Sequence, residues 1–275
     1  MPDIHPSRAT RRGAAAIAVL VAVFASLLVA PAARAEGSGP RPTIVLVHGA
    51  FANPSGWDAV RGELEGDGYH VVTPQLGLRS LEGDVAIVRA ALAAISGPIV
   101  LVGHSYGGAV ITNAAAGNPN ITALVYIAAF VPAVGETSLG LSTKFPGSVL
   151  PVAVVPTPIL NQGRPDVDLR VNPLLFRYAF TSNEVSPATA RAMAATQGPI
   201  TLSALLGKTT AAAWHTIPSW QLVATHDHAI APALQRFEVK RAGAHELDVA
   251  SGHAAMVSHP DAVTGLILAA VSATT

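Results

Sequence analysis

Residues 98–108 read Pro-Ile-Val-Leu-Val-Gly-His-Ser-Tyr-Gly-Gly, an apolar run that ends in a serine flanked by glycines. The apolar part has the length and the β-branched content of a buried strand. Gly103 and Gly107 stand two residues on either side of Ser105, a spacing typical of a tight strand-to-helix turn that exposes the serine hydroxyl. The apolar residues that follow can continue as a helix. The stretch therefore predicts strand, turn and helix, with Ser105 as the candidate nucleophile.

Short apolar runs alternate with helix-like segments along most of the chain. Continuous apolar strands separated by helices predict an α/β fold, in which a parallel sheet is covered by helices on both faces. We expect about six strands, most of them parallel. The predicted strands are 43–47, 69–73, 99–102, 124–127, 220–224 and 245–249, and the predicted helices are 57–65, 80–95, 232–242 and 260–272.

The alternation stops between about residues 132 and 214. Prolines are frequent in this stretch, and one helix-like segment begins near Ser186 and Pro187. A connection of this length is typical of an insertion with structure of its own, so we expect a helical cap over one end of the sheet. Large apolar side chains there either line a substrate pocket or pack in the core. The candidate pocket residues are Phe176, Phe180, Met193 and Trp214 in this stretch and Phe51 in the loop after the first strand.

The first 35 residues differ in composition from the rest of the chain. Arginines at 8, 11 and 12 precede the run 14–30, which is apolar except for one serine, and Ala33-Arg34-Ala35 follows. A basic start, an apolar run and a small-x-small cleavage site are typical of a secretory signal peptide. The run is shorter than the ~20 residues of a membrane-spanning helix. We therefore expect export, to the periplasm or outside the cell, and no membrane anchor after cleavage. The adjacent arginines leave the Sec and Tat routes both open.

The composition limits the partners of the chain. The 275 residues are half hydrophobic and 12% charged, enough for one α/β domain at residues 36–275. Without residues 1–35, which hold four arginines and one aspartate, the 17 basic and 17 acidic side chains fall to 13 and 16, a net charge of −3. We therefore expect no nucleic acid partner. The chain has no cysteine, which excludes a disulfide and a lipid-modified cysteine.

A serine nucleophile needs a general base, and the base needs an acid that fixes its tautomer. In a sheet of this kind the acid and then the base follow the serine, on loops at the carboxyl ends of later strands. Asp227 follows the strand 220–224 and is the candidate acid. It could instead cap the next turn. His226 and His228 beside it could form half of a metal site, although no third ligand lies near.

His253 is the candidate base because it lies in the loop after the last predicted strand, where it follows Gly252. His259 precedes a proline and fits the start of the last helix better, and His245 lies at the opposite end of its strand. Asp248 is an alternative acid, but it lies within the strand that leads to the base. The predicted triad is Ser105, His253 and Asp227.

Two backbone N–H groups should hold the oxyanion that forms when a serine attacks a carbonyl group. One belongs to Tyr106, directly after the serine, and the other to the loop after the first strand, which reads His48-Gly49-Ala50-Phe51. Ala50 is the expected second donor, with Phe51 as the alternative. His48 is expected to bond to nearby backbone instead.

Four motifs in this order resemble those of the α/β-hydrolase superfamily: HGAF at 48–51, GHSYGG at 103–108, THDHAIAP at 225–232 and SGHAAMVSHPDAV at 251–263. They look most like the small esterase and hydroxynitrile-lyase branch, which includes plant methyl-ester esterases. The resemblance covers nearly all of residues 42–272 and is weakest in the stretch 132–214. It implies the α/β-hydrolase fold and a reaction that needs no cofactor and no metal.

Two departures from this family refine the expectation. Few residues separate position 35 from the first strand, so the antiparallel pair that opens the family's full sheet is not expected. Hydroxynitrile lyases of this branch carry a lysine after the base and a threonine after the first-loop histidine, where this chain has Ala254 and Gly49, which disfavours cyanohydrin cleavage. Ser105 excludes relatives with an aspartate nucleophile.

The resemblance implies a serine carboxylesterase that hydrolyses small to medium apolar esters through an acyl-enzyme. The same triad could instead hydrolyse amides, lactones or C–C bonds, or support cofactor-free peroxidation. A protein of a different class, which binds a ligand without catalysis, is a further alternative. The expected partner is a small-molecule ester.

Overall fold

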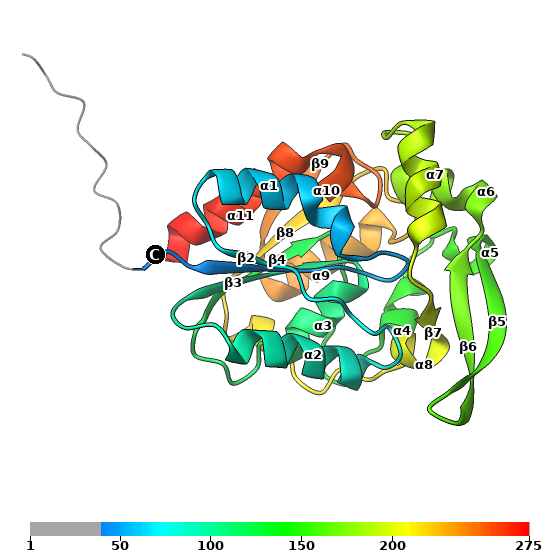
Figure 1. Cartoon of the computed structure of the whole chain (residues 1–275), viewed down its shortest axis with the longest axis horizontal. Coiled ribbons are helices and arrows are strands. Elements are labelled where there is room, and N and C mark those ends of the chain that lie inside the picture. Colours follow the sequence, from blue (N-terminus) through cyan, green and yellow to red (C-terminus); the bar gives the residue numbers. More distant parts are fainter. Residues whose placement is uncertain (1–39, 275) are drawn as a thin grey trace, which may run out of the picture. The chain divides into compact units, whose positions relative to one another are not determined.

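Six strands form the central sheet of the computed structural model, which describes residues 40–274 (Figure 1). They are β1 (Thr43–Val47), β2 (Val71–Val72), β3 (Ile99–His104), β4 (Ile121–Ile127), β8 (Ser219–Ala224) and β9 (His245–Val249). Every pair of neighbours is parallel, in the order β2-β1-β3-β4-β8-β9. The prediction of about six mostly parallel strands is confirmed.

The predicted signal peptide at residues 1–35 lies outside the described residues, so export and its route stay predictions. Between residues 40 and 274, no helix is both long and apolar enough to cross a membrane.

Helices cover both faces of the sheet. One face carries α1 (Asp58–Gly66) and α11 (Pro260–Thr274), and the other carries α2 (Leu81–Ala93) and α3 (Tyr106–Ala114) (Figure 1). Helix α9 (Pro232–Ala242) packs on β8, and the short α10 (Ala255–Ser258) leads into α11. Every residue of β1 and β3 is buried, as expected for apolar strands covered on both sides.

Helix α2 shows how local sequence determines an element boundary. The Ser80 side chain accepts a hydrogen bond from the Gly83 N–H and caps the first turn. The residues at helical spacing that face the core are Leu81, Val85, Val88 and Leu92. The helix ends at Ala93, so Ile95, which was predicted as its last apolar residue, packs on the core from beyond the helix.

The cap over the sheet is not purely helical, which corrects the prediction. It holds an antiparallel sheet of β5 (Val154–Asn161), β6 (Arg164–Val171) and β7 (Ile200–Thr201), in that order. Pro156 and Pro158 argued against a strand in the sequence, but β5 lies at the edge of this sheet, where proline is tolerated.

Short helices complete the cap. They are α4 (Ser138–Ser142), α5 (Leu150–Ala153), α6 (Pro173–Phe176), α7 (Pro187–Thr196) and α8 (Leu202–Leu205). The helix predicted near Ser186 is α7, whose first turn the Ser186 side chain caps. The cap lies beyond the carboxyl end of β1 and β3 (Figure 1), where the turn with Ser105 also lies.

Arg79, in the loop before α2, ties the cap to the sheet domain. Its guanidinium pairs with Asp168 of β6 and donates to the backbone oxygen of Pro199. Its own backbone oxygen accepts hydrogen bonds from the side chains of Asn161 (2.9 Å) and Thr201 (2.8 Å). One residue of the main domain therefore contacts both long strands of the cap hairpin and the segment around β7.

A buried carboxyl group joins α9 to the chain after β4. Glu238 is fully buried, and its Oε1 accepts the Val131 N–H at 2.9 Å. Burial raises the pKa of Glu238 from 4.5 to about 8, although the Val131 N–H and the nearby Arg241 act in the opposite direction. Glu238 is therefore mostly protonated at neutral pH in the folded chain.

Glu238 should make the stability of the fold depend on pH. Between pH 4.5 and 8 the folded chain keeps a proton that the unfolded chain has lost, so the free energy of unfolding falls as pH rises. The fall is at most about 1.4 kcal/mol per pH unit. Glu238→Gln keeps an oxygen for the Val131 N–H and should remove the contribution of Glu238 to this decrease in the free energy of unfolding. Urea unfolding of both proteins at pH 5 and pH 8 measures it, and parallel profiles would contradict the assignment.

Candidate active site

Ser105 lies on a sharp turn between β3 and α3. Its φ of 54° and ψ of −123° place a non-glycine residue in a strained region of backbone space. Backbone hydrogen bonds hold the turn, because the Ser105 carbonyl oxygen accepts the N–H groups of Gly108 (2.9 Å) and of Phe130 after β4 (3.1 Å). Strain that is fixed in this way is typical of a functional position.

The glycines around this serine are required by close backbone contacts. A Cβ at Gly103 would lie 2.7 Å from the Gly107 carbonyl oxygen, and a Cβ at Gly107 would lie 2.6 Å from the Val47 carbonyl oxygen. Real Cβ atoms do not approach other atoms so closely. The spacing in the sequence therefore reflects the packing of the turn against the end of β1.

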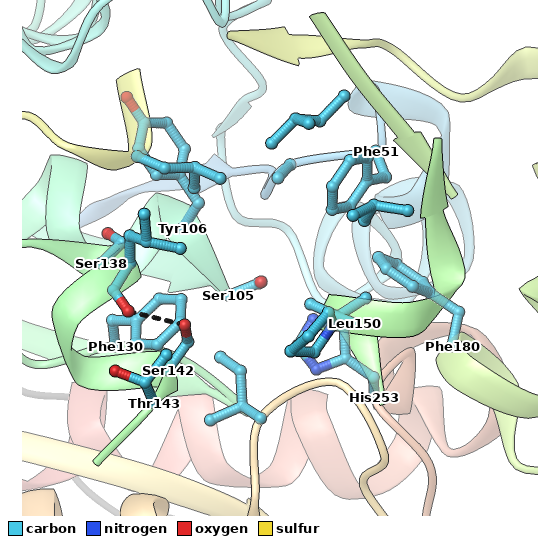
Figure 2. A pocket seen from close by; sticks show the side chains of 17 residues that line it. Phe51, Ser105, Tyr106, Phe130, Ser138, Ser142, Thr143, Leu150, Phe180 and His253 are labelled. Carbon is cyan, nitrogen blue, oxygen red and sulfur yellow. Dashed lines mark hydrogen bonds between the residues drawn. The ribbon is translucent and has the colours of Figure 1, made fainter. Parts of the chain in front are cut away.

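The loops after β8 and β9 bring Asp227 and His253 together. His253 Nδ1 lies 2.8 Å from Asp227 Oδ2, and both side chains are almost completely buried. His253 and Ser105 line the same pocket (Figure 2). The structure thus gathers all three predicted triad residues at the carboxyl end of the sheet.

The carboxylate of Asp227 has four hydrogen-bond donors around it. Oδ1 accepts the N–H groups of Ala229 (2.7 Å) and Ile230 (2.9 Å), so the residue caps the following turn, as the alternative interpretation of the sequence had it. Oδ2 faces His253 and also accepts Gln235 Nε2–H at 2.8 Å. Oδ1 therefore caps the turn, and Oδ2 contacts the imidazole of His253. Gln235, fully buried on α9, was not predicted, because nothing in the sequence marks a glutamine eight positions on.

The rival residues lie elsewhere. His226 contacts Glu184 (2.9 Å), and His228 stacks on Tyr178. Asp248 is exposed and pairs with Arg236, His259 contacts Ser258 at the start of α11, and His245 stacks on Trp220 at the start of β9. Within residues 40–274 no cluster of three or more metal-ligating side chains occurs.

Two other histidines lie near Ser105, and both are buried. Burial lowers the pKa of His48, although its bond to the Gly49 carbonyl oxygen raises it. The Leu76 N–H donates to His48 Nε2 at 3.0 Å, so Nδ1 carries the proton and donates to Gly49 at 2.9 Å. His48 thus bonds to backbone.

His104 directly precedes the serine. Burial, followed by repulsion from His253, lowers the pKa of His104 well below its usual range. Its neutral ring donates from Nε2 to the His253 carbonyl oxygen at 3.0 Å, so it holds the backbone of the predicted base.

Ala50 and Tyr106, whose N–H groups are the predicted oxyanion donors, both line the pocket. Neither N–H group donates to another group among residues 40–274. The Tyr106 side chain points away and donates to Asp84 Oδ2 at 2.9 Å, while Asp84 Oδ1 accepts the Leu78 N–H. Burial raises the pKa of Tyr106 and also that of Asp84. The sequence did not predict this contact of Asp84, because Asp84 lies on α2 and its partner Tyr106 on α3.

The pocket in front of Ser105 is a mostly apolar cavity of about 210 Å³ (Figure 2). Its apolar wall comes from the sheet loops and the cap: Phe51, Phe130, Leu139, Leu150, Pro151, Val154, Leu169, Phe180, Leu205 and Ile230. Three hydroxyl residues of the α4 region, Ser138, Ser142 and Thr143, lie on one side. Of the candidate pocket residues, Phe51 and Phe180 line this cavity.

Three of the candidate pocket residues lie outside this cavity, which corrects the prediction. Phe176 is buried behind Phe180, with ring centroids 5.0 Å apart. Trp214 Nε1 donates to the Pro132 carbonyl oxygen at 2.9 Å, and Met193 on α7 packs against the core. Apolar spacing in the cap sequence could not separate residues that face the cavity from those one layer behind.

Comparison with known proteins agrees with this architecture. The pattern of the family described as "Alpha/beta hydrolase family" matches residues 44–266. A carbendazim hydrolyzing esterase from Nocardioides sp. (strain SG-4G) is 35% identical over 113 residues, covering 36% of this chain and 47% of that protein. The chain thus matches about half the length of this relative. Alpha/beta hydrolase nvfD of Aspergillus novofumigatus (strain IBT 16806) is 26% identical over 250 residues, covering 82% of this chain and 95% of that protein.

The fold also recurs among solved structures. Polyneuridine aldehyde esterase superposes with a TM-score of 0.74 at 18% identity, covering 84% of this chain and 99% of that one. This likeness is one of fold, and the predicted α/β-hydrolase fold is confirmed. Since the family pattern spans most of the chain and the parallel sheet carries Ser105 on its strand-to-helix turn, the chain belongs to the alpha/beta hydrolase family.

Proposed function

We propose that the chain is a serine hydrolase that cleaves small to medium apolar carboxylic esters. The observation that carries the proposal is the buried 2.8 Å contact between His253 Nδ1 and Asp227 Oδ2, because His253 lines the same pocket as Ser105. A carboxylate at Nδ1 fixes the histidine tautomer and leaves Nε2 free to accept a proton. The name of the Nocardioides relative, an esterase, supports the same reaction class.

In the first step His253 Nε2 takes the proton of the Ser105 hydroxyl as the serine oxygen attacks the ester carbonyl carbon. The carbonyl oxygen becomes an oxyanion, and the N–H groups of Ala50 and Tyr106 are free to hold it. Asp227 stabilises the imidazolium that forms. His253 then gives its proton to the departing alcohol, which leaves an acyl group on the serine.

In the second step water replaces the alcohol. His253 takes a proton from water, the hydroxide attacks the acyl carbon, and the same two N–H groups hold the second oxyanion. The proton returns to Ser105 as the acid leaves. Ser105, His253, Asp227 and the two N–H groups are the catalytic groups of both steps.

The cavity supports the substrate class. Its volume of about 210 Å³ and its apolar wall fit a small or medium apolar acyl or alcohol group. Charged substituents would lose their hydration there without a paired charge. Free carboxylates and ammonium groups on the substrate are therefore disfavoured.

A fluorophosphonate probe tests the nucleophile directly. The native protein should become labelled, and Ser105→Ala should not, because the probe reacts with an activated serine oxygen. Ser142→Ala serves as the matched control, since Ser142 lines the same cavity and should leave the label in place. Mass spectrometry of the labelled peptide measures the result. An unlabelled native protein would mean that Ser105 is not an activated nucleophile, and equal label on Ser105→Ala would mean that another residue reacts; either result would overturn the proposal.

A further inference from the structure

Residues 178–184 of the cap contact both loops that carry the proposed acid and base, here called the Asp227 loop (225–231) and the His253 loop (250–254). The contacting segment overlaps η2 (Arg177–Thr181), a single π-helical turn, and the two residues after this turn have left-handed φ values of 46° and 67°. Such turns and non-glycine left-handed residues cost energy and cluster at functional sites. The conformation of the segment therefore indicates that its contacts constrain it.

Hydrogen bonds join this segment to each loop. The Ala254 N–H donates to the Phe180 carbonyl oxygen at 3.0 Å, and Ser182 Oγ donates to the His226 carbonyl oxygen at 2.5 Å. The Phe180 ring also meets the His253 ring edge to face, with centroids 4.8 Å apart (Figure 2). The cap thus reaches the backbone of both loops.

Glu184 contacts both loops with one carboxylate. Its Oε2 accepts the Gly252 N–H at 2.6 Å, and its Oε1 lies 2.9 Å from His226 Nδ1. Gly252 directly precedes His253, and His226 directly precedes Asp227. A single side chain from the cap therefore joins the two residues that stand next to the proposed base and the proposed acid.

We propose that Glu184 is a positioning residue that holds the two loops at the separation that the Asp227–His253 hydrogen bond requires. This inference rests on the proposed function. The Glu184 side chain is 20% exposed, so its bond to a backbone N–H is charge-assisted and partly sheltered from water. A displacement of about 1 Å at a catalytic group costs about 100-fold in rate. Glu184 does not line the cavity, so it acts on turnover and not on substrate binding.

Two substitutions at this position separate positioning from charge. Glu184→Ala removes both contacts and should lower kcat for p-nitrophenyl butyrate roughly 10-fold to 100-fold, with KM changed less than about threefold. Glu184→Gln keeps an oxygen for the Gly252 N–H and a polar group for His226, so it should restore kcat to within about threefold of the native value.

Glu136→Ala is the matched control for stability. Glu136 also accepts one backbone N–H, that of Ala133 at 2.9 Å, and pairs with one basic side chain, Arg241. It lies outside the cavity and outside both loops. Glu136→Ala should lower the melting temperature about as much as Glu184→Ala does, but it should leave kcat unchanged.

The outcomes distinguish this inference from the proposed function. Failure of the native protein to react with the fluorophosphonate probe would overturn the proposed function itself. With labelling intact, an unchanged kcat in Glu184→Ala would overturn the positioning role alone. An equal loss of kcat in Glu136→Ala would assign the effect to stability. An equal loss in Glu184→Gln would assign it to the charge of the side chain. Either result would also overturn the positioning role.

Discussion

Replacing Asp227 with asparagine should lower kcat for p-nitrophenyl butyrate hydrolysis by about 10⁴-fold. The reason is the set of donors around the carboxylate. Two backbone N–H groups hold Oδ1, so the new NH₂ group has to occupy the place of Oδ2, where it faces Gln235 Nε2 and His253 Nδ1. The NH₂ group can donate a hydrogen bond to His253 Nδ1 but cannot accept one from it. The imidazole proton then moves to Nε2, the atom that has to accept the proton of Ser105.

Asp248→Asn is the matched control for this change. Asp248 is the alternative acid that the sequence offered, and it is exposed and paired with Arg236 on the surface. Surface pairs of this kind contribute little to stability, so kcat should change less than about twofold. Steady-state kinetics of both variants, with folding checked by circular dichroism, measure the difference. A native kcat in Asp227→Asn would remove this residue from the mechanism.

Gly107→Ala should lower the free energy of unfolding by about 3 kcal/mol, at the upper end of overpacking costs. The added Cβ would lie 2.6 Å from the Val47 carbonyl oxygen and 2.7 Å from that of His48. Both are backbone atoms at the end of β1, which cannot rotate away as a side chain can. The turn with Ser105 would have to shift, so activity should fall as well.

Gly62→Ala tests whether this cost comes from space or from glycine itself. Gly62 lies in the middle of α1, and no atom lies within 4 Å of its added Cβ. The same substitution there should be neutral or stabilise by up to about 1 kcal/mol, because alanine is the better helix former. Urea unfolding of both variants measures the contrast. Equal effects at the two positions would contradict the packing argument.

The parts of the fold that the sequence could predict are those that depend on local patterns. Continuous apolar runs placed the strands, and Ser80 placed the start of α2. The turn around Ser105 follows from glycine spacing because the contacts that require glycine lie within a few residues or on the next strand. Asp227 and His253 follow from their places after strands, because parallel strands bring those loops to one edge.

The parts that escaped prediction depend on contacts between distant segments. Gln235, Asp84 and Glu184 are polar residues without a local motif, and their partners became visible only when helices and cap packed together. The cap sheet escaped because Pro156 and Pro158 disfavour a strand unless the strand lies at an edge. Edge position is a property of the assembled sheet and not of the segment.

Those two prolines also have a consequence for how molecules of this protein meet one another. Pro156 and Pro158 pair with Leu169 and Val167 of β6, and alternate residues of a strand direct their N–H groups to the same side. Asn161 and Arg164 flank the hairpin loop and form its closing hydrogen-bonded pair, so positions 158 and 156 fall at the alternate sites that face away from β6. Proline has no N–H group, and the outer edge of β5 therefore lacks donors at these two positions. A strand from another molecule would find no donors at these positions. The exposed edge of the cap is thereby protected against edge-to-edge aggregation, even though Leu160 of the same strand is 72% exposed.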